Sequence, residues 1–173
     1  SPVPMQSQVF DDFDAFAQQV RDADFRMLLL NPARHTWAIS QVNLGGINIQ
    51  IGQEGGGNIT EGRSRSDGYL FFVPVTNASA HAANGSVLDN GSIVVLEPGI
   101  EFCLRSEVEH DWCSVFVPTS RLTRDGSSAE PRSETTKMAC RVTRPTLPIA
   151  DQLRAMVQQV MAADAQCAGF AAT

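Results

Sequence analysis

The sequence predicts a mainly β domain with flanking helices, built as an antiparallel sandwich or barrel. Between residues 36 and 117, many short segments alternate apolar and polar side chains, and Gly, Pro and Asn turn signals separate them. No helical pattern of about 10–15 residues lies between these segments, which argues against a parallel α/β sheet. Helical spacing of apolar residues occurs before this region and after it.

Length and charge restrict the function. The chain has 173 residues, a formal net charge of -6 and a pI near 4.9, which suits one domain able to bury a core. Its basic residues are scattered, which argues against direct nucleic-acid binding, because such surfaces cluster Lys and Arg to neutralise phosphates. No apolar run approaches the roughly 18–20 residues of a membrane span, and the first residues lack the apolar core of a secretion signal. We therefore expect a cytoplasmic protein without a membrane partner.

The first expected element is a helix over residues 11–23. Asp11 can accept a hydrogen bond as its N-cap, and Asp12 and Asp14 lie in the first turn, where the helix dipole favours negative charge. Apolar residues recur at i, i+3, i+4 and i+7 and form a stripe that can pack on a larger body. The stripe consists of Phe13, Phe16, Ala17 and Val20.

The central region takes the period of β-strands. Residues 47–51 alternate isoleucine with polar side chains, the pattern of a half-buried strand. The run 93–96 is apolar throughout and rich in β-branched residues, which indicates a strand covered on both faces. Asn-Gly at 90–91 predicts a hairpin turn before it, and Pro-Gly at 98–99 predicts a type II turn after it. The expected strands cover residues 36–43, 47–51, 59–65, 69–75, 86–88, 93–96, 102–105 and 112–117.

The C-terminal part divides into two expected segments after a barrel over residues 9–122. Residues 123–147 are mostly polar, which predicts a linker that contains a short extended piece. A helix follows within residues 148–173, a region that we expect to mediate dimerisation. Its tight apolar seam can pack on the barrel or on another copy of itself. The residues expected at the dimer contact are Leu153, Met156, Val157, Val160 and Met161.

Sequence motifs give no support for catalysis. The chain lacks the G-x-S-x-G, P-loop and G-x-G-x-x-G motifs. Its histidines, His35, His81 and His110, form no H-x-H or H-x-x-H pair, so we expect surface histidines rather than metal ligands. The alternating carboxylates within residues 107–111 suit a solvated turn or a cation site. We therefore predict no catalytic residue, no metal and no cofactor.

Aromatic residues on the expected strands suggest a binding cavity instead. A small barrel lined in this way can hold a ligand between its sheets, although each ring alone could simply fill the core. Trp37 and Trp112 carry an indole N–H that needs a partner when buried. Polar residues such as Gln41, Asn48 and Ser114 could orient a ligand by hydrogen bonds. The predicted ligand-binding residues are Trp37, Ile39, Gln41, Phe71, Val73, Phe102, Trp112 and Phe116.

The order of these segments resembles a known family. A helix that begins with Asp-Asp-Phe-Asp-Ala-Phe (11–16) precedes the strands, and residues 91–99 carry a G-x-x-x-x-L-x-P-G turn. Trp-Cys-Ser-Val-Phe-Val-Pro (112–118) precedes Arg121-Leu122, a polar linker and an amphipathic helix. Over residues 9 to about 165, this layout resembles the N-terminal effector-binding and dimerisation domain of AraC/XylS-type bacterial transcription regulators.

The resemblance implies a cupin-like, jelly-roll barrel that binds a small-molecule effector, with C-terminal helices that form a homodimer. It also implies DNA binding through a helix-turn-helix domain, and because no such pattern follows, we expect that domain to lie outside this chain. The family has no single set of effector residues, so the resemblance assigns none here. Two other hypotheses stay open: a metal-dependent cupin-fold enzyme, and an interaction module whose filled barrel binds no ligand.

Overall fold

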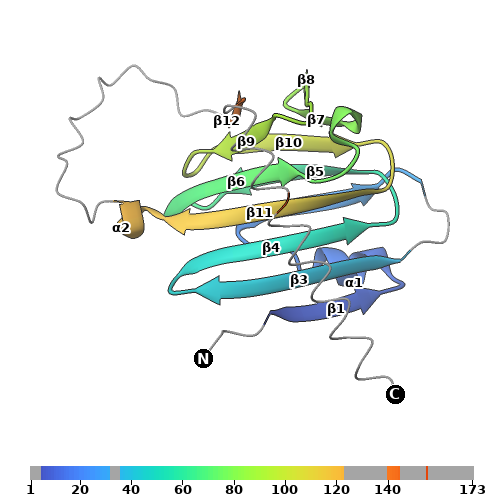
Figure 1. Cartoon of the computed structure of the whole chain (residues 1–173), viewed down its shortest axis with the longest axis horizontal. Helices are drawn as coiled ribbons and strands as arrows, with labels where there is room; N and C mark the ends of the chain where they lie inside the picture. The colour runs from blue at the N-terminus through green and yellow to red at the C-terminus, as the bar shows by residue number, and fades with distance from the viewer. Residues whose placement is uncertain (1–4, 32–35, 123–139, 145–154, 156–173) are drawn as a thin grey trace.

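The computed structural model describes residues 5–31, 36–122, 140–144 and 155. Over these residues the chain is mainly β and forms two antiparallel sheets (Figure 1). One sheet has seven strands in the order β1-β3-β4-β11-β6-β9-β12, and the other has five in the order β2-β5-β10-β7-β8. The expected antiparallel β domain is confirmed, but its two sheets do not close into a barrel.

The seven-stranded sheet is built around β11 (His110–Pro118). This strand pairs with β4 (Ile47–Glu54) on one side and with β6 (Gly68–Pro74) on the other. Side chains alternate between the two faces of a strand, so His110, Trp112 and Ser114 share the face that meets the second sheet. The other strands of this sheet are β1 (Gln6–Phe10), β3 (Trp37–Leu44), β9 (Ile93–Leu96) and β12 (Cys140–Thr143).

The five-stranded sheet is built around β5 (Asn58–Ser64), which pairs with β2 (Ala23–Leu29) and β10 (Glu101–Ser106). Burial alternates along β2, so Phe25 and Met27 are half-buried while the residues between them are exposed. The remaining elements of this layer are β7 (His81–Ala83), β8 (Ser86–Val87) and the short 3-10 helix η1 (Ala78–Ala80). A short helix α2 (Thr119–Leu122) follows β11.

The N-terminal helix is much shorter than the sequence predicts. It is α1 (Phe13–Ala17), and its N-cap is Asp12, whose side chain accepts a hydrogen bond from the Ala15 backbone N–H at 2.9 Å. The expected helix over 11–23 is therefore wrong beyond residue 17. Asp22 has a positive φ of 74° and turns the chain into β2, because the alternating pattern that starts at Ala23 belongs to a strand rather than to a helix.

The hairpin turn at positive φ lies at Asn84-Gly85 rather than at Asn90-Gly91. Asn84 and Gly85 have φ of 45° and 83° and connect β7 to β8. At residues 89–92 the turn is held instead by the Asp89 side chain, which accepts hydrogen bonds from the Gly91 N–H and the Ser92 hydroxyl. Because the Asp89 side chain closes the turn by hydrogen bonds, neither Asn90 nor Gly91 has to adopt a positive φ.

The buried run 93–96 does not form a hairpin with the next strand, because the two strands belong to different sheets. Val94 and Leu96 are fully buried, as the sequence predicts. β9 lies in the seven-stranded sheet and β10 in the five-stranded sheet, and the turn between them has Gly99 at φ 69°. The chain therefore crosses between layers at Pro98-Gly99, and Leu96 and Phe102 pack in one core cluster.

After the linker the structure describes one strand, β12, at the edge of the seven-stranded sheet (Figure 1). It pairs with β9, and ion pairs join Arg141 to Glu97 (3.3 Å) and Arg144 to Asp89 (2.8 Å). The expected dimerisation residues Leu153, Met156, Val157, Val160 and Met161 lie outside the described residues. Within the described ranges, no helix has the length and apolar character to cross a membrane.

Candidate ligand-binding cavity

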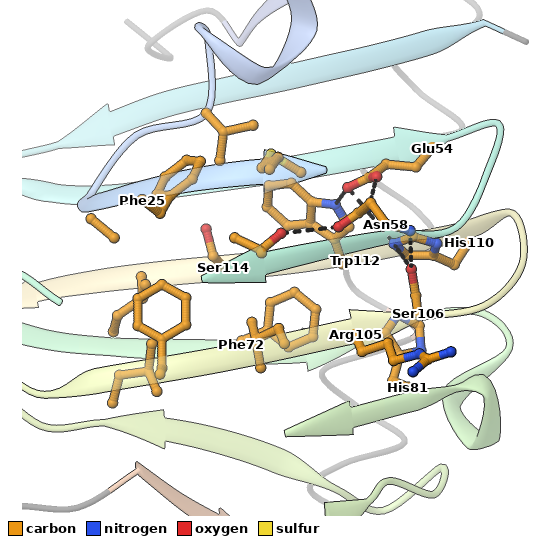
Figure 2. Close-up of a pocket in the computed structure, with 18 of the residues that line it drawn as sticks. Phe25, Glu54, Asn58, Phe72, His81, Arg105, Ser106, His110, Trp112 and Ser114 are labelled. Atoms are coloured by element: carbon orange, nitrogen blue, oxygen red, sulfur yellow. Dashed lines mark hydrogen bonds and ion pairs between the residues drawn. The ribbon is translucent and has the colours of Figure 1, made fainter. Parts of the chain in front are cut away.

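A small cavity of about 70 Å³ lies between the two sheets. Its walls are mostly apolar and come from both layers (Figure 2). The five-stranded sheet supplies Phe25, Met27, Phe102 and Leu104, and the seven-stranded sheet supplies Leu70, Phe72, Leu96 and Trp112. A concave, mostly apolar space with few polar groups is the usual form of a small-molecule site.

One end of the cavity is polar, and Glu54 is its central residue. Glu54 ends β4 and is 5% exposed. Its carboxyl group accepts a hydrogen bond from Trp112 Nε1 at 2.6 Å and another from Asn58 Nδ2 (Figure 2). Burial nevertheless raises the pKa of Glu54 to about 8, because the loss of hydration outweighs both hydrogen bonds. The carboxyl group is therefore mostly protonated and neutral near pH 7.

Two buried histidines complete the polar end. The His110 ring places Nδ1 2.8 Å from the Val108 carbonyl oxygen and Nε2 3.4 Å from the Ser106 hydroxyl. The His81 ring meets it edge-on, with ring centroids 4.6 Å apart. Burial and then the neighbouring His81 lower the pKa of His110 to about 4, and burial also lowers the pKa of His81. The 3.7 Å approach of His110 Nε2 to Glu54 Oε1 therefore joins two neutral groups near pH 7.

Gly52 makes room for the Trp112 indole. The two residues are register partners in β4 and β11, and a Cβ atom on Gly52 would overlap the indole ring, Nε1 included. Because Gly52 has no side chain, the indole lies across β4 and its N–H reaches Glu54, two residues further along the same strand. The local sequence Gly-Gln-Glu at 52–54 thus sets the polar end of the cavity.

The structure brings only part of the predicted ligand-binding set to this cavity. Phe102 and Trp112 line it. Trp37 and Ile39 do not line the cavity but belong to an adjoining apolar cluster that also contains Trp112. Phe71 and Val73 alternate with Phe72 and so lie on the opposite face of β6. Gln41 accepts a hydrogen bond from Gln50 Nε2 (3.0 Å), and Phe116 is buried beneath the Arg65 guanidinium at 4.2 Å; neither lines the cavity.

Sequence reasoning missed the polar end. His81 and His110, expected on the surface, are 4% and 5% exposed, so that expectation is wrong. His110 had a usable signal: it continues the alternation of Trp112, Ser114 and Phe116 two residues towards the start of β11. Glu54 and Asn58 had none, since they flank a Gly-Gly-Gly run that reads as an ordinary turn.

In the part of the chain that the structure describes, no three histidine, cysteine, aspartate or glutamate side chains come together in a way that could hold a metal ion. Both histidines direct Nδ1 to a backbone carbonyl oxygen, and Glu54 is held by Trp112 and Asn58. The arrangement is suited to hydrogen bonding with a bound organic molecule.

We expect Gly52→Ala to lower the free energy of unfolding by roughly 2–4 kcal/mol, because the new methyl group displaces Trp112 and breaks its hydrogen bond to Glu54. Urea denaturation followed by far-UV circular dichroism measures the change. Gly91→Ala is the matched control, because Gly91 lies in an open turn at ordinary φ. Equal stability of the two variants would contradict the assigned role of Gly52.

The raised pKa of Glu54 predicts a pH-dependent stability. A carboxyl group with a folded-state pKa of about 8 stabilises the fold fully below its unfolded pKa of about 4.5 and loses that contribution as pH rises towards 8. Glu54→Gln cannot ionise at this position. As pH rises from 6 to 8, the unfolding free energy of the wild type should therefore fall by about 2 kcal/mol relative to that of Glu54→Gln. Denaturation at both pH values tests this. Glu101→Gln, at an exposed glutamate, is the control and should track the wild type at both pH values. If the difference in unfolding free energy between Glu54→Gln and the wild type is the same at both pH values, the raised pKa of Glu54 is contradicted.

Comparison with known proteins gives a relationship at the level of the fold. No protein family matches the sequence, and no curated protein matches it. Among solved structures, the chain is similar to the crystal structure of the AraC-like transcriptional activator CuxR, with a TM-score of 0.52 and 15% sequence identity. The similarity covers 68% of this chain and 48% of that one, so this chain corresponds to about half the length of the activator. The chain thus shares its fold with part of an AraC-like transcriptional activator.

Proposed function

We propose that this chain is the ligand-sensing and dimerisation part of an AraC-type bacterial transcription regulator. In this proposal it works in the cytoplasm, has no catalytic activity of its own and controls transcription through a DNA-binding domain outside this chain. The observation that carries the proposal is the inter-sheet cavity, which combines apolar walls with a buried polar end. Its occurrence in a fold shared with part of an AraC-like transcriptional activator supports a regulatory use rather than a structural one.

The cavity gives a physical basis for sensing. A ligand regulates a protein only if it binds two conformations with different affinity, and a difference of about 1–3 kcal/mol is sufficient. The lining comes from strands of both sheets, so a ligand that fills the cavity favours one spacing of the layers over another. A change of this kind is the signal that a dimerisation segment would pass to a DNA-binding domain.

A screen of small organic acids, sugars and aromatic compounds by thermal unfolding tests ligand binding. A compound at 100 times its Kd should add about 2.7 kcal/mol to the unfolding free energy. Ser114→Leu, which extends a side chain into the cavity, should abolish the shift. Val115→Leu is the matched control, because Val115 is the next residue of β11 and packs on the opposite face. A shift that survives in Ser114→Leu would place the ligand elsewhere.

The dimer is tested separately by gel filtration with light scattering. We expect a dimer for the wild type and a monomer for Leu153→Asp, because a charge in the apolar seam opposes helix pairing. Gln158→Asp, at a polar position of the same predicted helix, should leave the dimer intact. A wild-type monomer at high concentration that Leu153→Asp does not change would contradict this part of the proposal.

A second candidate is a metal-dependent cupin-fold enzyme, for which the polar end supplies only pairwise contacts, between His110 and Glu54 and between the two imidazoles. Elemental analysis of the purified protein distinguishes the two functions. Stoichiometric iron, manganese or zinc that is lost in His81→Ala would favour the enzyme, and protein without such a metal would favour the sensor.

A further inference from the structure

The buried polar end of the cavity presents hydrogen-bond acceptors. His81 Nδ1 lies 3.1 Å from the Asn77 carbonyl oxygen. A carbonyl oxygen can only accept, so the proton of the neutral ring is on Nδ1 and Nε2 carries a lone pair. His81 Nε2 is buried and has no hydrogen-bond partner, although the residue lines the cavity. A buried acceptor left in this state is costly, and an incoming donor relieves that cost.

His110 has the same tautomer for the same reason. Its Nδ1 donates to the Val108 carbonyl oxygen at 2.8 Å, so Nε2 is again the acceptor and faces the Ser106 hydroxyl at 3.4 Å. Both rings therefore direct lone pairs, and no N–H, towards the interior. This matters because an anionic ligand needs donors or positive charge, and neutral imidazoles of this tautomer supply neither at Nε2.

Several of the other donors at this end already have partners. Trp112 Nε1 and Asn58 Nδ2 donate to Glu54, and the Thr60 hydroxyl donates to Asn58 Oδ1. Arg105 is more than half exposed and pairs with Glu107 at 3.2 Å. Ser114 contributes a hydroxyl that can donate or accept. The exposed Arg21 and the protonated carboxyl group of Glu54 are further donors of the lining. What distinguishes the polar end is the acceptor at His81 Nε2, which has no partner.

We propose, on the basis of the ligand-binding function above, that the cavity takes a mainly apolar molecule that presents a hydroxyl or N–H donor to His81 Nε2. The walls suited to the apolar body include Phe25, Phe72 and Phe102. Figure 2 shows Glu54 and His110 to one side of Phe25 and Phe72. A carboxylate in the same position has only lone pairs to offer, which repel the lone pair on His81 Nε2. It also loses its hydrogen bonds to water and gains none from His81 in exchange. At His81 itself, an uncharged donor is therefore favoured over a carboxylate.

Three probes of similar size test this inference by isothermal titration calorimetry on the full chain: phenol, anisole and benzoate. Phenol carries a donor, anisole has only an acceptor, and benzoate is an anion. Phenol should bind about three- to tenfold more tightly than anisole, the effect of one neutral hydrogen bond, and benzoate should bind most weakly. His81→Phe keeps the ring but removes the acceptor, so the affinity for phenol should fall to that for anisole. Arg26→Ala, at an exposed residue on the outer face of β2, should leave all three unchanged.

The outcomes separate this inference from the proposed function. If anisole or benzoate binds as tightly as phenol, or if His81→Phe keeps the preference for phenol, the cavity binds ligands but not by a donor to His81. If none of the three probes binds, both the donor preference and the proposed ligand cavity are contradicted. The comparison of the three probes on the wild type does not depend on the folding of any variant.

Discussion

The structure depends on the burial of one carboxyl group between two sheets. Glu54 at the end of β4 is held by Trp112 from β11 and by Asn58, the first residue of β5. A buried carboxyl group is tolerated only with hydrogen-bond partners or without its charge, and here both conditions are met. Because Asn58 belongs to the second sheet, this cluster fixes how the two layers meet at one end, and the empty space between them begins beside it.

The sequence was informative where one face of a strand is apolar. The alternation along residues 47–51 and 112–117 places β4 and β11 nearly as observed, and the continuous apolar run 93–96 marks a strand buried on both faces. The N-terminal helix was overestimated because Phe13, Phe16 and Val20 keep helical spacing through a turn, and that spacing cannot show a positive φ at Asp22. Helical spacing of apolar residues therefore does not show where a helix ends, because the turn and its tertiary contacts decide that.

The candidate site was harder to predict than the fold, for a physical reason. Aromatic residues that fill a core and those that line a cavity have the same periodicity, so Phe71 and Phe72 differ only in which face of β6 each occupies. Buried polar residues give a weaker signal still, because Glu54, Asn58 and His81 look like surface residues unless their partners are known. Those partners, at positions 112, 77 and 54, are distant in the sequence or belong to turns.

The neutral state of the polar end is consistent with a site for uncharged molecules. Burial moves the pKa values of Glu54 and His110 in opposite directions, and each shift removes a charge near pH 7. A cluster of this kind contributes hydrogen-bond direction without a strong electric field, which favours selection by shape and donor placement over selection by charge.

The position of β12 has a consequence for communication within the molecule. Leu96 of β9 lines the cavity and is the register partner of Cys140, so a single step across a strand pair separates the cavity wall from the chain that leads towards the C-terminal end. The ion pairs of Arg141 with Glu97 and of Arg144 with Asp89 join β12 to the segments on either side of β9. The cavity wall and the chain that continues beyond residue 144 are thus neighbours across one strand pair.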